Sequence, residues 1–155
     1  MSEIYRTKTA KELTESDIGK TVTLCGWVEN IRDHGGVSFI DLRDYYGVVQ
    51  VVMRDTTLLR GIAKEDCVSV AGIIEARDEE TYNPKIPTGT IELNCRSVKI
   101  LGKVRESLPF EIITSKETRE ELRLKYRFLD LRNRKVKDNV VFRAQVISFL
   151  RREME

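Results

Sequence analysis

Two apolar segments, Val37-Ser-Phe-Ile-Asp-Leu-Arg43 and Val48-Val-Gln-Val-Val-Met53, are separated by a turn signal at Tyr46-Gly47. Both segments are rich in β-branched and aromatic residues, which favour strands over helices. Tyrosine followed by glycine between two such segments is typical of a chain reversal. We therefore predict two successive strands, the second and third of a β-domain.

Three further segments around this pair have the same texture, residues 21–28 before it and residues 67–74 and 90–100 after it. Gly26 lies inside the first of them, where a glycine suggests a bulge or a sharp coil. Leucines and an isoleucine at helical spacing predict a short helix over residues 57–65. Five strands with a helix between the third and fourth are the order of an OB-fold, a five-stranded Greek-key barrel. The predicted core is therefore all-β.

Beyond the fifth strand, helical patterns replace the strand patterns. We expect the OB-fold domain with an N-terminal extension over residues 1–104, a small helical hinge or linker over 105–138, and the first helix of a further domain over 139–155. Within the hinge, residues 115–124 are predicted to form a helix. The final helical pattern has no stop signal, so we expect that the sequence was cut from a longer protein.

Charge follows the same division. Residues 1–95 hold 11 basic and 16 acidic residues, a net charge of −5, whereas residues 96–155 hold 16 and 9, a net charge of +7. The whole chain, at +2, excludes a histone-like cation. It has no apolar run of membrane-spanning length and no signal-peptide pattern. No membrane partner is therefore expected.

The cysteine and histidine residues give little reason to expect a disulfide bond or a metal site. Cys25, Cys67 and Cys95 are far apart in the sequence, and we expect them to be reduced and buried. His34 is the single histidine, so no metal site is predicted. The familiar nucleophile and phosphate-loop motifs are missing from the sequence, and no catalytic residue is predicted in it.

The outer face of the barrel offers candidates for nucleic-acid binding. Side chains alternate across a strand, so Ile40 and Leu42 should enter the core while Phe39 faces outward. An outward aromatic side chain provides a stacking platform for a base, unless the N-terminal extension covers it. Gln50 faces opposite ways from Val49 and Val51, and its carboxamide suits a Watson–Crick edge. The alternative is that Gln50 is a solvent-facing residue without a role.

Polar residues near the strand ends add to this set. Arg32 ends the first strand, and Arg77, Thr81 and Asn83 begin the long loop between the fourth and fifth strands. OB-folds use this loop for ligand contacts. The arginines suit phosphate binding or base stacking, although single surface arginines usually do neither.

Several strings resemble one family, the bacterial-type aspartyl-tRNA synthetases of class II. They are Gly26-Trp-Val28, Arg32-Asp-His-Gly-Gly36, Phe39-Ile-Asp-Leu-Arg-Asp44, Val49-Gln-Val51 and Arg123-Leu-Lys-Tyr-Arg-Phe-Leu-Asp-Leu-Arg132. The first four resemble the anticodon-binding domain and the last resembles the entry to the catalytic domain. The resemblance implies a cytoplasmic homodimer that uses ATP and Mg²⁺ to join aspartate to tRNA-Asp. It also implies that the catalytic motifs lie beyond residue 155, so that this stretch alone binds tRNA without catalysis or a cofactor.

The resemblance also implies roles for single residues. Phe39 matches the aromatic that stacks on an anticodon base, and Gln50 matches the glutamine that reads the central uracil. Arg32 matches an arginine that contacts bases or backbone, and Asn83 and Glu92 match residues that contact the first anticodon base. With Arg77 added, the predicted anticodon-binding set is Arg32, Phe39, Gln50, Arg77, Asn83 and Glu92.

The sequence departs from the family pattern at some positions. Asn30 and Ile31 stand where the family often has arginines, and Thr81 stands where asparagine is common. His34 and Thr81 lie where enzymes that charge tRNA-Asp alone differ from those that also charge tRNA-Asn. Two other interpretations stay open: the same domain in an asparaginyl- or lysyl-tRNA synthetase, and a free-standing OB module that binds single strands.

Overall fold

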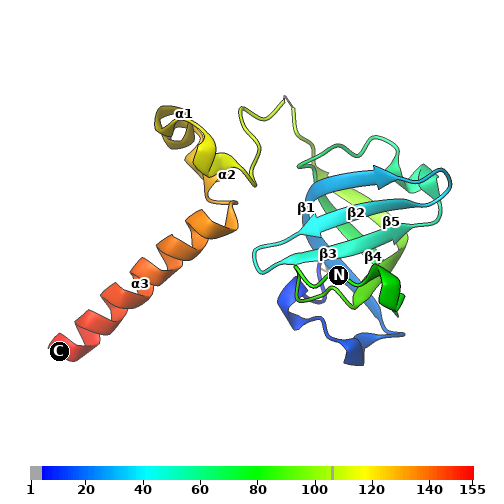
Figure 1. Ribbon diagram of the computed structural model, residues 1–155, viewed down its shortest axis with the longest axis horizontal. Coiled ribbons are helices and arrows are strands. Elements are labelled where there is room, and N and C mark those ends of the chain that lie inside the picture. The colour runs from blue at the N-terminus through cyan, green and yellow to red at the C-terminus, as the bar shows by residue number, and fades with distance from the viewer. Residues whose placement is uncertain (1–4, 106) are drawn as a thin grey trace. The chain divides into compact units, whose positions relative to one another are not determined.

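The computed structural model describes residues 5–105 and 107–155. The chain divides into two compact units, Met1–Arg105 and Glu106–Glu155, each of which is described by itself. The first unit is a β-barrel and the second is helical (Figure 1). The division lies next to residue 104, where the sequence places the end of the barrel domain.

Five strands build the first unit. They are β1 (Thr21–Asp33), β2 (Ser38–Arg43), β3 (Val48–Met53), β4 (Cys67–Ala76) and β5 (Ile91–Gly102). They close into a barrel in the order β1-β2-β3-β5-β4. All neighbours are antiparallel except β3 and β5, which run parallel. This closed Greek-key barrel confirms the predicted OB-fold.

The first strand differs in detail from its prediction. It continues to Asp33, well past residue 28, and its bulge lies between Val28 and Asn30 rather than at Gly26. Gly26 has another reason to be glycine: a Cβ there would lie 2.4 Å from the carbonyl oxygen of Arg43. The residue is therefore needed for close backbone approach.

The helix predicted over residues 57–65 is wrong in extent. The structure has only a 3-10 turn at Thr56–Leu59, whose N-terminus is capped by the carboxylate of Asp55. Gly61 follows with a φ of 74°, a left-handed conformation that ends the turn. The helical spacing of the apolar residues arose because Leu58, Leu59 and Ile62 pack against the barrel core.

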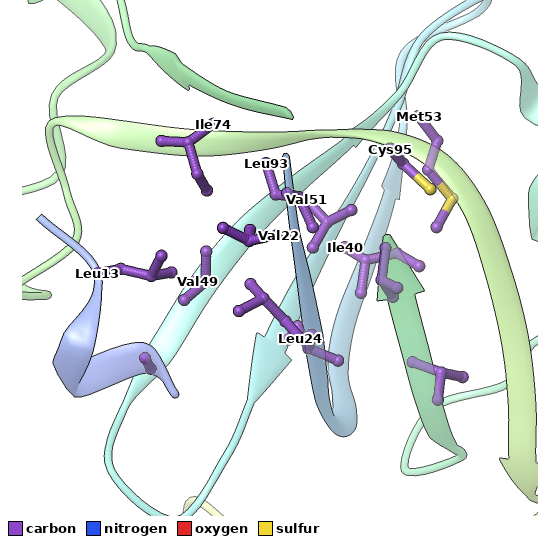
Figure 2. Close-up of a cluster of buried hydrophobic side chains, with 14 of the residues drawn as sticks. Leu13, Val22, Leu24, Ile40, Val49, Val51, Met53, Ile74, Leu93 and Cys95 are labelled. Atoms are coloured by element: carbon purple, nitrogen blue, oxygen red, sulfur yellow. The ribbon is translucent and has the colours of Figure 1, made fainter. Parts of the chain in front are cut away.

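The barrel core consists of apolar side chains, mostly aliphatic, and every strand contributes to it (Figure 2). Ile40, Val51, Val68 and Leu93 are fully buried. Each such side chain contributes about 1.5–3 kcal/mol by leaving water. Leu13 of the N-terminal extension joins the same cluster, so the extension is part of the folded unit.

The second unit holds a 3-10 turn (Ser115–Glu117), α1 (Glu120–Lys125), α2 (Arg127–Asp130) and α3 (Arg134–Met154). The single helix predicted over residues 115–124 is therefore broken into two pieces. The last helix begins at Arg134 and not at 139, because the Asn133 side chain caps it by accepting hydrogen bonds from the amides of Lys135 and Val136. In the two described ranges, no helix combines the length and hydropathy needed to cross a bilayer.

Asp130 and Asn133 hold this unit together. Asn133 donates from its amide to the carbonyls of Ile112 and Ile113, both at 2.8 Å. Asp130 is fully buried and accepts two hydrogen bonds from Arg123. Burial is the largest single influence and opposes ionisation of Asp130, but the hydrogen bonds and positive charges around it, led by those of Arg123, together outweigh burial and lower the pKa of the carboxyl group. The aspartate therefore stays charged and fixes the turn between the helices.

Candidate nucleic-acid interface

Strand register places the candidate residues in two rows on the outer face of the barrel. In β2, Phe39 lies opposite Arg32 of β1 and Val52 of β3. Two residues further along, Asp41 lies opposite Asn30 of β1 and Gln50 of β3. Because directly opposed residues point to the same side of a sheet, each row is a set of neighbours.

A continuous polar network joins Arg32 of the first row to the second row and to β5. Both terminal nitrogens of Arg32 donate to the carboxylate of Asp41, each at 2.8 Å. One of them also donates to the side-chain oxygen of Gln50 at 3.2 Å. The Gln50 amide in turn donates to a carboxylate oxygen of Glu92 at 2.9 Å. Residues from β1, β2, β3 and β5 are thus joined in what we call the face network, composed of Arg32, Asp41, Gln50 and Glu92.

Gln50 is less accessible than the sequence indicates. Its side chain points to the outer face by register, but the residue is only 8% exposed because its network neighbours lie against it. The interpretation of Gln50 as a freely solvent-facing residue is therefore wrong. A carboxamide has two N–H donors and an oxygen with two lone pairs. One donor and one lone pair remain after the bonds to Arg32 and Glu92, and this is the pair of functions that a base edge requires.

Arg77 is also more buried than expected. Its side chain is 8% exposed, and its Nε lies 3.9 Å from a carboxylate oxygen of Glu92, an ion-pair and not a hydrogen-bond distance. A terminal nitrogen donates to the carbonyl of Thr81. Arg77 therefore fixes the start of the β4–β5 loop, which a surface arginine would not do.

Glu92 sits in an environment that disfavours its charge. Burial is the largest influence and raises the pKa of its carboxyl group above the ordinary value, although the hydrogen bond from Gln50 and the charge of Arg77 act in the opposite direction. The neutral form of Glu92 is therefore favoured more than it would be in water.

Phe39 lies in the neighbouring row, half-buried. His34 meets the Phe39 ring edge-on, with 5.6 Å between the ring centroids and 79° between the planes. The following residues, Gly35 and Gly36, both have positive φ and make the turn that returns the chain to β2. The aromatic pair thus forms a platform beside the face network.

Asn83 and Thr81 belong to the loop and not to the network. Asn83 accepts a hydrogen bond from the amide of Lys85 at 3.1 Å, and the Thr81 hydroxyl donates to the carbonyl of Asp78 at 2.8 Å. The carbonyl of Asn83 would lie 1.9 Å from a Cβ at Gly89, so the two ends of the loop pack backbone against backbone. These bonds shape the loop, and the link to the network runs through Arg77.

Asp41 is a member that sequence reasoning missed. It anchors Arg32 with two bonds and also accepts one from the side chain of Asn30 at 3.2 Å. The available signal was its spacing, two residues from Phe39 on the same strand face. Asn30, at a position where arginine is common in the resembled family, thus supports the anchor of Arg32.

Metal and thiol chemistry add nothing to the site. In the part of the chain that the structure describes, no three His, Cys, Asp or Glu side chains gather closely enough to hold a metal ion. The three cysteines are free; Cys95 is buried, and Cys25 and Cys67 are half-buried rather than fully buried as predicted. Burial raises the pKa of the Cys95 thiol to about 11, so it stays protonated at neutral pH.

Comparison with known proteins gives concordant results. The family model for tRNA anticodon-binding domains, described as an OB-fold nucleic acid binding domain, matches residues 22–101. The aspartate–tRNA(Asp/Asn) ligase of Dinoroseobacter shibae is 47% identical over 154 residues, covering 97% of this chain and 26% of that protein. The ligase of the same name from a Ruegeria species is 46% identical, with the same coverage of both chains. This chain therefore spans about a quarter of the length of the curated relatives it matches.

Solved structures share the architecture. An aspartyl-tRNA synthetase from Entamoeba histolytica aligns with a TM-score of 0.74 at 22% identity, over 95% of this chain and 37% of that one. At this identity the likeness shows the fold alone. It agrees with the barrel topology described above.

Proposed function

This chain belongs to the family of OB-fold nucleic-acid-binding domains, and on that premise we propose that it recognises the anticodon of tRNA-Asp as the N-terminal part of an aspartate–tRNA ligase. The observation that carries the proposal is the face network beside Phe39, which combines a stacking surface with unused donors and acceptors. The names of the relatives with 47% and 46% identity support the choice of ligase.

Recognition is proposed to work by stacking and by exchange of hydrogen bonds. A base stacks on Phe39, a contact worth about 1–3 kcal/mol. The next base meets the free donor and acceptor of Gln50, whose orientation is fixed because Arg32 holds its oxygen and Glu92 its nitrogen. A fixed carboxamide discriminates bases, since a mismatched edge faces a donor where it needs an acceptor.

The same barrel is proposed to accept tRNA-Asn as a second substrate. The printed names of the relatives include both tRNA-Asp and tRNA-Asn. Their anticodons share two bases and differ in the third. His34 lies against Phe39, and Thr81 begins the β4–β5 loop; we propose that these two residues set the tolerance at that base.

The whole protein is proposed to be a cytoplasmic homodimer that uses ATP and Mg²⁺. The described residues supply no metal-ligand set, so the proposal for this chain is RNA binding alone. Helix α3 supports the homodimer. Phe142, Val146, Phe149 and Leu150 are exposed and recur at helical spacing along one face.

A titration of this chain with RNA stem-loops tests the proposal. The stem-loops carry the Asp, the Asn or an unrelated anticodon on one common stem, and binding is followed by fluorescence anisotropy at two salt concentrations. We expect the first two to bind more tightly than the third, with a ratio that survives higher salt because base contacts release few counterions. Equal affinity for all three stem-loops would refute anticodon recognition.

A further inference from the structure

The N-terminal extension forms a second polar site at the turn between β2 and β3. A pocket of about 530 Å³ opens there, lined by Arg6, Thr7, Lys8, Thr9, Lys11, Glu12 and Tyr46. Its volume lies within the roughly 300–1,000 Å³ typical of ligand sites. None of these residues belongs to the face network.

The walls of the pocket are fixed by one carboxylate. One oxygen of Asp44 accepts a hydrogen bond from the amide of Ala10 in the extension at 2.7 Å. The other oxygen accepts from the amides of Tyr46 and Gly47 at 2.7 and 2.8 Å. The amide of Thr7 also bonds to the carbonyl of Thr23 in β1 at 2.8 Å. The pocket is therefore pre-formed on the barrel and needs no ordering when a ligand binds.

The charges in the pocket leave a cationic surplus. Lys8 is neutralised by Asp17, whose carboxylate lies 2.6 Å away. The carboxylate of Glu12 is held by the amide and hydroxyl of Thr9, both at 2.7 Å. Arg6 and Lys11 are exposed and form no ion pair with any residue in the described ranges. Arg6 and Lys11, set against the one lining carboxylate of Glu12, leave a net positive charge, which favours an anionic ligand.

Aromatic residues stand beside these cations. Tyr45 and Tyr46 are 52% and 47% exposed and meet edge-on, with 4.9 Å between their ring centroids. A phenolic hydroxyl donates to phosphate oxygens, as tyrosines do in nucleic-acid complexes. Of the two tyrosines, Tyr46 lines the pocket beside the cations.

The place of the pocket at the end of the β2–β3 hairpin sets its distance from the residues proposed to bind bases. Arg43 and Val48 form the last pair before the turn, and the row of Asp41 and Gln50 lies two residues beyond them. The row of Phe39 lies two residues further still, about 13 Å from the end of the hairpin at 3.3–3.4 Å per residue. At about 3.4 Å of advance per phosphate along one strand, this distance corresponds to about four nucleotides.

We propose that this pocket binds the phosphodiester backbone of the anticodon stem, a few nucleotides from the bases that the barrel recognises. The inference rests on the proposed function for the identity of the RNA. Arg6 and Lys11 supply the charge, and Tyr46 and Thr7 supply neutral donors. The pocket provides phosphate contacts outside the face network, whose single arginine is paired with Asp41.

The test compares salt dependence between the wild type and the double variant R6Q/K11Q. Both residues are exposed, so the fold is retained, which circular dichroism checks. Each lost phosphate contact makes the slope of log K against log salt shallower by about 0.7–0.9. We expect a shallower slope by about 1.5 and weaker binding at low salt for the stem-loop. For the loop sequence alone, as a single strand without the stem, we expect no difference between the two proteins.

Arg96 provides the matched control. It is an exposed arginine on β5 that does not line the pocket. R96Q removes a charge of the same kind, and its slope should stay within error of the wild type. Two results would overturn the proposal that the pocket binds the stem: equal salt slopes for R6Q/K11Q and wild type, or a change of slope in R96Q as large as that in R6Q/K11Q.

Two further outcomes separate the possible errors. Saturable binding of inorganic phosphate, seen by ³¹P line broadening, together with an unchanged RNA slope would assign the pocket to a free anion and overturn the proposal. If the wild type bound all anticodons equally but the slope difference on stem RNA persisted, the proposed function would be refuted and the pocket proposal would not. The two failures are therefore distinguishable.

Discussion

Strand β2 carries two arginine-centred networks, and their difference separates folding from recognition. At one end, Arg43 donates to both oxygens of Glu65, at 2.9 and 2.7 Å, and to Glu29 at 3.0 Å. Its side chain is 9% exposed and that of Glu65 is 1%. Across the β1–β2 pairing, Arg32 makes an equally short bidentate contact with Asp41, but its side chain is 44% exposed.

Burial decides what each pair can do. Removal from water disfavours the Arg43 charge, but its bonds to Glu65 and Glu29 outweigh this and raise the pKa of the guanidinium group. The ring of Trp27 lies 6.0 Å from it and closes the site further. We call this buried Arg43–Glu65 pair locked, because removing either partner would leave the other as an uncompensated buried charge. Arg32 keeps access to water, so exchanging Asp41 for another anion costs it little.

The largest predicted effect concerns the locked pair. Arg43→Met leaves Glu65 buried without its partner, so the free energy of unfolding should fall by about 3–5 kcal/mol. Urea denaturation of the chain measures it. Arg32→Met is the matched variant and should cost less than about 1 kcal/mol. Similar losses of unfolding free energy in the two variants would contradict the distinction between the two networks.

The second prediction tests the stacking platform next to the exchangeable pair. Phe39→Ala should weaken binding of the tRNA-Asp anticodon stem-loop by about 1–3 kcal/mol, because one base loses its aromatic partner. Fluorescence anisotropy gives the dissociation constants. Phe142→Ala in α3 removes an equally large, exposed ring from the other unit and should leave the affinity unchanged. Unchanged affinity in Phe39→Ala with an intact fold would remove Phe39 from the site.

The third prediction concerns selectivity. Gln50→Ala should relax discrimination at the central anticodon base by about 1 kcal/mol, the worth of an ordinary hydrogen bond. The measurement compares stem-loops that differ only at that base. Discrimination should fall more than affinity for the whole set falls. A uniform loss for every base would mean that Gln50 only braces Arg32 and Glu92.

The smallest predicted effect is a pH dependence in the face network. Because burial raises the pKa of Glu92, its stabilising contribution is complete below the unfolded value of 4.5 and is lost as the pH rises through the folded pKa. Glu92→Gln mimics the neutral form and keeps an acceptor for Gln50. The variant should therefore gain stability relative to wild type between pH 4 and pH 7, measured by urea denaturation at constant ionic strength. Parallel pH curves would contradict the shift.

Part of this molecule could be predicted from local patterns. The period of two along residues 37–43 and 48–53 places Ile40 in the core and Phe39 outside, since alternation depends only on the backbone of one strand. The order of elements then limits the fold to a small barrel. Helix boundaries were less predictable: Gly61 and Asn133 override the apolar spacing around them. The RNA-binding roles of Arg32, Phe39, Gln50, Arg77, Asn83 and Glu92 stay predictions.

Local patterns predicted the five strands in their order along the chain and the faces of Ile40 and Phe39, although β1 continues further than its pattern indicates. The contact between Gln50 and Glu92 could not be predicted in this way, because it depends on the parallel pairing of β3 with β5, strands that are not consecutive. The difference in exposure between Arg43 and Arg32, two arginines that look alike in the sequence, also arises only when the barrel closes. Exposure to water is set by what the closed barrel folds over each group, and water determines whether a charge pair stabilises the fold or remains available to a ligand.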